Sequence, residues 1–197
     1  MKYFQVKHLL EILCILFFSP LIIPIIIITS LIIKISEPKA PIFYTQNRMG
    51  LNGCKFKIYK FRSMTYKPSK IDTNKFASEE QHRITKFGRI IRKYRIDEFP
   101  QFYNILKGDM SLICPRPEQY DIAKEYILKI DGYSRRHVVR PGITGLAQVI
   151  NGYTDSEDKT RVKLKSDLEY IENMSFKNDL LIMLETIRIM ATGFGAK

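Results

Sequence analysis

Residues 12–33 read ILCILFFSPLIIPIIIITSLII, an apolar stretch of 22 residues that contains no charged side chain. A helix of that length can cross the roughly 30 Å hydrocarbon core of a bilayer. The stretch is too long for the apolar part of a signal peptide, and no small-residue cleavage site follows it. The sequence therefore predicts an N-terminal helix that is inserted in a membrane.

Two prolines lie in the middle of this stretch, Pro20 directly after Ser19 and Pro24 one helical turn later. Each proline removes a backbone donor and clashes with the carbonyl four residues before it. Two such positions one turn apart predict a helix that is kinked or broken near mid-membrane. We expect the break at Ser19 and Pro20.

Lysines flank the apolar stretch on both sides, at positions 2, 7, 34 and 39. A spanning helix would place one of these basic flanks outside the cell, against the positive-inside tendency. A helix that enters, breaks and returns keeps both flanks in the cytoplasm. A single span with a proline kink is the alternative, because membrane helices tolerate proline. We favour the re-entrant form, with residues 1–36 inserted in the membrane and residues 37–197 forming a cytosolic domain.

The charge balance indicates an anionic partner. The chain has 32 Lys and Arg against 20 Asp and Glu, which leaves a formal charge of +12. Such a field favours nucleic acid, an anionic membrane surface or phosphorylated substrates. Three cysteines and three histidines are scattered along the chain. Their spacing is not that of a zinc site or a disulfide framework, and the thiols fit a reducing compartment.

Residues 42–46 and 55–64 have strand character, and the turn-rich segment between them contains Gly50 and Asn52-Gly53. This pattern predicts a β-hairpin. The polar residues 67–81 are expected to form a loop. Helical spacing recurs at residues 87–94, 98–107, 118–130, 159–173 and 178–190. The last of these helices is apolar enough either for the core or for a membrane interface. The expected class is α+β, mostly helical.

The adjacent carboxylates Asp97 and Glu98 are the candidate catalytic pair. Asp97 is expected to cap a helix over residues 98–107, where free amides and the helix dipole favour anions. Basic residues surround the pair in the sequence, among them Arg92 and Arg116. In such a site one carboxylate can be a nucleophile or a ligand for Mg²⁺, while the cations neutralise phosphate oxygens. The alternative is an Asp that only caps a solvated helix.

Five segments carry a family resemblance: residues 59–64 (YKFRSM), 96–101 (IDEFPQ), 104–112 (NILKGDMSL), 115–117 (PRP) and 140–148 (RPGITGLAQ). The turn at 46–50 and the Asp167-x-x-Tyr170 spacing also match. Together they resemble, in family order and over nearly the whole chain, the monotopic polyprenol-phosphate phosphoglycosyl transferases of the bacterial sugar transferase family. The short length resembles the minimal, Campylobacter-type members.

This resemblance implies an enzyme that transfers a phosphosugar from a UDP-sugar to polyprenol (undecaprenyl) phosphate, giving polyprenyl-diphosphosugar and UMP. It would be the first membrane step of a bacterial glycoconjugate pathway. Asp97 resembles the nucleophile that forms an aspartyl-phosphosugar intermediate, and Glu98 resembles the Mg²⁺ ligand. The implied location is the cytoplasmic face of the inner membrane, among its lipids, with both termini cytoplasmic.

The resemblance also implies a set of substrate-binding residues: Lys60, Arg62, Arg92, Arg116, Arg140 and Gln148. Ser19-Pro20 matches the family's helix break. Nucleic acid is not expected as a partner, because the chain carries no nucleic-acid-binding motif. A scaffold that binds anionic lipid would explain the charge but not the ordered motifs.

The chain departs from the family pattern at a few positions. Cys114 replaces a glycine before the Pro-Arg-Pro segment, and Arg95 replaces a small polar residue near the nucleophile. Leu146 stands where tryptophan is common. Tyr153 stands where an arginine often follows the Asn-Gly pair, here Asn151-Gly152. None of these positions belongs to the carboxylate pair, so they bear on the choice of sugar rather than on the reaction class.

Overall fold

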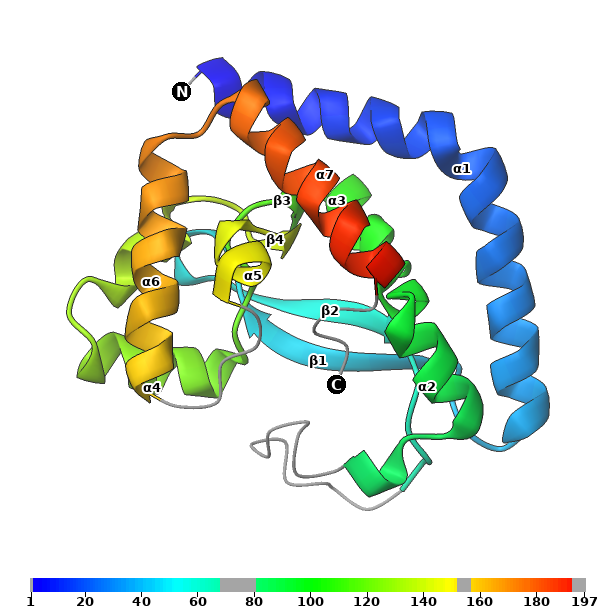
Figure 1. The fold of residues 1–197 in the computed structure, drawn as a ribbon. Helices are drawn as coiled ribbons and strands as arrows, with labels where there is room; N and C mark the ends of the chain where they lie inside the picture. The colour runs from blue at the N-terminus through cyan, green and yellow to red at the C-terminus, as the bar shows by residue number, and fades with distance from the viewer. Residues whose placement is uncertain (1, 68–80, 152–156, 193–197) are drawn as a thin grey trace.

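The computed structural model describes residues 2–67, 81–151 and 157–192. The described elements are mostly helical, with two small sheets (Figure 1). In chain order they are α1 (Lys2–Ser36), β1 (Phe43–Met49), η1 (Leu51–Gly53), β2 (Lys55–Phe61), η2 (Gln81–Arg83), α2 (Lys86–Lys93), η3 (Ile96–Glu98), α3 (Gln101–Lys107), β3 (Ser111–Ile113), α4 (Tyr120–Lys129), η4 (Tyr133–Val138), β4 (Gly142–Thr144), α5 (Leu146–Asn151), α6 (Glu157–Glu172) and α7 (Phe176–Thr192). This arrangement has the mostly helical, α+β character that the sequence predicted.

Helix α1 is continuous from Lys2 to Ser36 and contains both prolines. Figure 1 shows that it bends sharply near its middle. Pro20 has no N–H for the carbonyl of Leu16, and the Ser19 hydroxyl donates a hydrogen bond to that carbonyl at 2.7 Å instead. Where the sequence predicted a break, the structure therefore has a bend within one helix, stabilised by a side-chain donor.

Both halves of α1 pack against the rest of the chain. In the first half, Lys7 is buried and its ammonium donates to the carbonyl of Ile113 at 2.6 Å and to Asp179 on α7 at 2.6 Å. In the second half, Ile33 is buried in a cluster with Phe61 of β2 and with α2. Much of the surface between these contacts is exposed and apolar. Among the described residues, α1 is the one helix that is long and apolar enough to cross a membrane.

The β-hairpin is confirmed, with strand ends that differ from the expected ones. β1 and β2 pair antiparallel, from Phe43 opposite Phe61 to Met49 opposite Lys55. Their connection passes through Asn52 and Gly53, which adopt φ values of 53° and 77°. Asn and Gly tolerate this left-handed region best, which explains the turn at this position.

The second sheet was not predicted. β3 and β4 form a short parallel pair in which Ser111 lies opposite Gly142. Neither segment has a recognisable strand pattern in the sequence, because each strand is only three residues long. A Cβ on Gly142 would lie 2.2 Å from the nitrogen of Cys114, so only glycine lets the two backbones approach this closely.

The predicted start of the helix over residues 98–107, with Asp97 as its cap, is wrong. A 3-10 turn, η3, carries Asp97 and Glu98, and α3 begins after Pro100. Proline has no N–H to continue a helical ladder, so regular hydrogen bonding starts beyond it. Gly108, with φ of 89°, follows Lys107 in the left-handed conformation that commonly ends a helix, so the predicted end of this helix is confirmed.

The C-terminal helix α7 has a buried face and an exposed apolar face. Ile182 of α7 is buried in a cluster with Cys114 and Tyr170. Leu180, Leu184 and other apolar residues of the same helix are exposed. One face of α7 therefore belongs to the core, and another is apolar surface. The predicted loop over residues 67–81 lies almost entirely outside the described residues.

Candidate active site

The carboxylate pair lies on a strained turn. Arg95, directly before η3, has φ of 53° and ψ of 20°, in the left-handed region. This conformation costs a residue with a side chain roughly 1–2 kcal/mol and is found where the surrounding structure imposes it, often at functional sites. The turn that follows buries Glu98 and leaves Asp97 only partly buried. Two adjacent carboxylates thus have different surroundings.

Glu98 is held between two cations from different elements. Lys60 of β2 donates to Oε1 at 3.0 Å. Arg116 donates to Oε2 through Nη1 at 3.1 Å and to Oε1 through Nη2. Burial alone would raise the pKa of Glu98, but the charges of Arg116 and Lys60 outweigh it and hold this pKa well below its usual range. Glu98 is therefore anionic at every physiological pH.

Asp97 has the opposite shift. Burial, followed by the negative charge of Glu98, raises the pKa of Asp97 to about 6, against the opposing charges of Lys60, Arg92 and Arg116. Within the described ranges, no residue donates a hydrogen bond to the Asp97 carboxylate. At neutral pH this carboxylate is mostly ionised, close to cations and not occupied by a donor. These properties suit a nucleophile.

The pair fits a magnesium ion that arrives with a phosphate, rather than one held by the protein alone. Among the described residues, no group of three His, Cys, Asp or Glu side chains is placed to hold a metal. A carboxylate has about four lone-pair positions, and Glu98 uses three of them for Lys60 and Arg116. Mg²⁺ is commonly bound by one or two carboxylates together with substrate phosphates and water. Glu98 and Asp97 supply that minimum.

Of the six predicted substrate-binding residues, three lie around the pair and a fourth, Gln148, shares a carbonyl partner with one of them. Lys60 and Arg116 contact Glu98, and the positive charge of Arg92 on α2 acts on Asp97. Gln148 of α5 and Arg116 both donate to the carbonyl of Ile143, at 3.4 and 2.7 Å. The amide oxygen of Gln148 is buried without a hydrogen-bond partner.

The other two lie at the ends of α1. Arg62 pairs with Glu37 and donates to the carbonyl of Ile33 at 3.3 Å, at the C-terminal end of the helix. Arg140 lies over the ring of Phe4, with its guanidinium carbon 5.1 Å from the ring centre. These contacts of the two arginines join the apolar helix to the domain.

Two buried residues, Arg136 and Asp167, and the half-buried Arg48 support Arg116 and were not predicted as site residues. Arg136 donates to the carbonyl of Arg116 at 2.8 Å and forms an ion pair with Asp167 at 2.7 Å. Arg48 donates to the carbonyl of Pro117 at 3.1 Å. Arg48 and Asp167 belong to segments that match the family pattern, which was the available signal. Nothing in the sequence distinguishes Arg136 from its neighbour Arg135.

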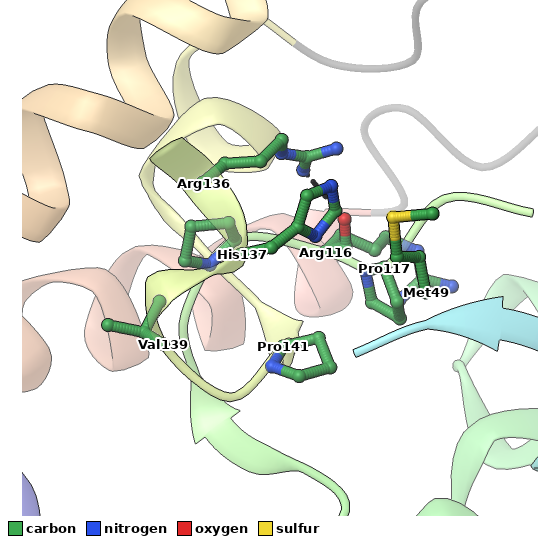
Figure 2. A pocket seen from close by; sticks show the side chains of 8 residues that line it. Met49, Arg116, Pro117, Arg136, His137, Val139 and Pro141 are labelled. Carbon is green, nitrogen blue, oxygen red and sulfur yellow. Dashed lines mark hydrogen bonds between the residues drawn. The ribbon is translucent and has the colours of Figure 1, made fainter. Parts of the chain in front are cut away.

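A small hollow lies beside this support. Figure 2 shows Arg136 and His137 of η4 on one side of it, and Arg116, Pro117 and Met49 on another. Burial lowers the pKa of His137 to about 4, helped by the charge of Arg136, so this imidazole is neutral at physiological pH. Arg116 lines the hollow and also donates to Glu98, so this residue links the hollow to the carboxylate pair.

Comparison with known proteins identifies the family. The family model described as bacterial sugar transferase matches residues 2–193. The chain belongs to this family. The resemblance carried by the five motif segments is thereby confirmed.

Several curated members of the bacterial sugar transferase family are similar over most of this chain. A UDP-N-acetylgalactosamine-undecaprenyl-phosphate N-acetylgalactosaminephosphotransferase of Aeromonas hydrophila is 46% identical over 99% of the chain, which covers 46% of that protein. A UDP-glucose:undecaprenyl-phosphate glucose-1-phosphate transferase of Caulobacter vibrioides is 36% identical over 94% of the chain and 70% of its own length. The corresponding Escherichia coli protein is 40% identical, and this chain spans 36% of it. The chain thus covers about half or less of two of these three relatives.

Proposed function

We propose that this protein transfers a phosphosugar from a UDP-sugar to undecaprenyl phosphate, giving undecaprenyl-diphosphosugar and UMP. The observation that carries this proposal is the pairing of an ionised Glu98, which is bound by two cations, with the adjacent carboxylate of Asp97, on which three cations act. Membership of the bacterial sugar transferase family and the names of its relatives support the same reaction.

The first step is attack by an Asp97 carboxylate oxygen on the β-phosphorus of the donor. A new P–O bond forms to Asp97, the bond from this phosphorus to the bridging oxygen breaks, and UMP leaves with that electron pair. Phosphoryl transfer depends mainly on alignment and charge neutralisation. Lys60, Arg92 and Arg116 supply positive charge around the pair.

In the second step, a phosphate oxygen of undecaprenyl phosphate attacks the same phosphorus. The bond to Asp97 breaks and the carboxylate is regenerated, so no proton is consumed in either step. Glu98 stays paired with Lys60 and Arg116 and holds these cations beside the reacting phosphorus. Its low pKa keeps it ionised throughout.

We also propose that Mg²⁺ accompanies the donor and is bound by Glu98, with Asp97 beside it. When bound, the ion would neutralise negative charge on the pyrophosphate oxygens. The support is the chemistry of the two carboxylates and the lone pair that Glu98 retains.

Release of UMP by the purified protein tests the reaction. UDP-N-acetylgalactosamine, UDP-glucose and UDP-galactose are each incubated with and without undecaprenyl phosphate. We expect turnover with one or more donors, ping-pong kinetics, and a mass increase of one phosphosugar on Asp97 when the acceptor is omitted. Asp97→Asn should lose both the adduct and turnover, while Asp121→Asn, an exposed carboxylate on α4, should retain them. Sequential kinetics, no adduct and an active Asp97→Asn would contradict the covalent route.

For the membrane, we propose that α1 enters and leaves on the cytoplasmic side, so that both termini are cytoplasmic. A straight helix of 35 residues would be about 52 Å long. Lys7 in its first half and Ile33 in its second half both pack on the same domain. A helix that crosses the bilayer cannot keep both contacts on one side, which supports the re-entrant form.

Labelling with a membrane-impermeant thiol reagent tests this topology. Single cysteines at positions 3 and 37, in a variant without the native three cysteines, should both be protected in intact cells. Replacing Pro20 and Pro24 together by Ala should favour spanning, since each proline costs a helix interior about 3 kcal/mol. Labelling at position 3 alone in the unsubstituted helix would show a span.

A further inference from the structure

The segment that carries Arg116 is held by its carbonyl groups. Each of the four carbonyls from Pro115 to Glu118 accepts a hydrogen bond from another part of the chain. The donors, in order, are the backbone N of Gly142 at 3.0 Å, Nη2 of Arg136 at 2.8 Å, Nη1 of Arg48 at 3.1 Å and the backbone N of Met49 at 3.1 Å.

The segment needs this external support. Pro115 and Pro117 have no N–H, so half of its residues cannot donate a backbone hydrogen bond. Proline fixes φ at these two positions but not the direction in which the carbonyl between them points. The bond from Arg136 fixes that direction at Arg116 (Figure 2). The bond from Arg48 does the same at Pro117.

The two supporting arginines are themselves immobilised. Arg136 is 4% exposed, donates to the Tyr133 hydroxyl at 2.8 Å and pairs with Asp167 at 2.7 Å. Arg48 donates to the side-chain oxygen of Gln46 at 2.6 Å and lies 3.5 Å from Glu118. A planar guanidinium can make several such bonds at once in fixed directions, which a lysine ammonium cannot reproduce.

We infer that Arg48 and Arg136 are positioning residues that act through Arg116. They hold the carbonyls of the Pro115–Pro117 segment so that the Arg116 guanidinium meets both oxygens of Glu98. This role deepens the proposed function and rests on it, because Arg116 is one of the three cations to which that function assigns charge neutralisation at the donor.

A double-mutant cycle tests the inference. Turnover and KM for the donor are measured for Arg136→Lys and Arg48→Lys, each in the natural background and in Arg116→Lys. With Arg116 present, each substitution should lower kcat by about ten-fold with a smaller change in KM, since a misplacement of about 1 Å can cost that much or more. In Arg116→Lys the same substitutions should lower kcat by less than about two-fold.

Arg135→Lys is the matched control, because Arg135 is the neighbour of Arg136 but forms an exposed ion pair with Glu172. It should leave kcat unchanged in both backgrounds. If Arg136→Lys does not fold, Arg48→Lys carries the cycle alone. If Arg136→Lys and Arg48→Lys lower kcat by the same factor in the Arg116→Lys background as in the natural one, the positioning role is overturned. A merely structural defect would give that result, because it does not depend on residue 116.

Hydrogen–deuterium exchange of a peptide over residues 111–120 separates this inference from the proposed function. Exchange should be faster in Arg136→Lys and in Arg48→Lys than in Arg135→Lys. Unchanged exchange would overturn the inference whatever the reaction is. Absence of UMP release from the unsubstituted protein would instead count against the proposed function and leave the exchange result to decide the positioning role.

Discussion

Two arginine–carboxylate pairs lie side by side in this protein, joined by one hydrogen bond from Arg136 to the carbonyl of Arg116. In the first, Arg116 and Lys60 hold Glu98. In the second, Arg136 holds Asp167, and both side chains are almost fully buried. Both pairs join arginine to a carboxylate, yet the pKa values of the two carboxylates are shifted in opposite directions.

The pKa of Glu98 is held low, because two cations outweigh the effect of burial. Burial raises the pKa of Asp167 in spite of the charges of Arg136 and Lys163. A buried ion pair contributes little net stability, but removal of one partner leaves a costly unpaired charge. Both side chains of the Asp167 pair are almost fully buried, whereas Lys60 and Arg116 keep 19% and 16% of their side chains exposed. Loss of the carboxylate should therefore cost more stability at Asp167, where the arginine that is left unpaired has less access to solvent.

The largest expected effect is a loss of UMP release when Glu98 or its metal ion is removed. Chelation should abolish UMP release and added Mg²⁺ should restore it, because Glu98 supplies the charge that the cation needs. Glu98→Gln should lower turnover by about 10²–10³-fold, as removal of one electrostatic stabiliser does in other enzymes. Turnover is measured as UMP release, with circular dichroism as the check on folding. Full activity of Glu98→Gln in excess chelator would contradict the assignment.

The second prediction concerns stability. Asp167→Asn should lower the free energy of unfolding by about 3–5 kcal/mol, since it leaves the Arg136 guanidinium buried without its carboxylate. Denaturant titration in detergent measures this loss, and kcat per folded molecule should fall by less than in Glu98→Gln. Equal losses of stability in the two variants would remove the distinction between the pairs.

The third prediction is a pH dependence of moderate size. Protonation of Asp97 removes the charge of the nucleophile, and its pKa is raised to about 6. UMP release in the absence of acceptor should therefore be level above about pH 7 and fall as the pH drops below 6, by about ten-fold per pH unit. Stopped-time assays across this range measure the rate. A rate that stays level down to pH 4 would exclude Asp97 as the titrating nucleophile.

The smallest effect is expected at a third, exposed pair. Arg135 and Glu172 lie 3.0 Å apart with about 60% of each side chain exposed. Glu172→Gln should change the free energy of unfolding by less than about 1 kcal/mol, because solvent screens exposed pairs. The same denaturant titration measures it. A loss as large as that of Asp167→Asn would show that burial is not what separates these pairs.

The sequence identified the elements that have strong local patterns. The apolar helix, the hairpin and the long helices follow from periodicity and turn residues. The start of α3 does not follow from local pattern, because it depends on hydrogen bonding around Pro100. The β3–β4 sheet does not follow either, because it depends on a close contact between Cys114 and Gly142. Short parallel strands leave little pattern in either segment.

For the site, the sequence identified the carboxylates and most of their cationic neighbours. It did not distinguish Arg116, which contacts Glu98, from Arg62, which pairs with Glu37. Both are arginines in family motifs, and only the fold decides which carboxylate each one meets. Arg136 was missed for the same reason, since its role depends on a carbonyl that is 20 residues away along the chain.

The bond between Lys7 and Asp179 has a consequence for the order of synthesis. The two residues are 172 positions apart, so a ribosome that adds about 5–20 residues per second makes Lys7 roughly 10–35 s before its carboxylate. Throughout that time the first half of α1 has no partner on α7. Its docked position is therefore a late product of folding, and a chain released before Asp179 would leave the Lys7 ammonium without this counter-ion.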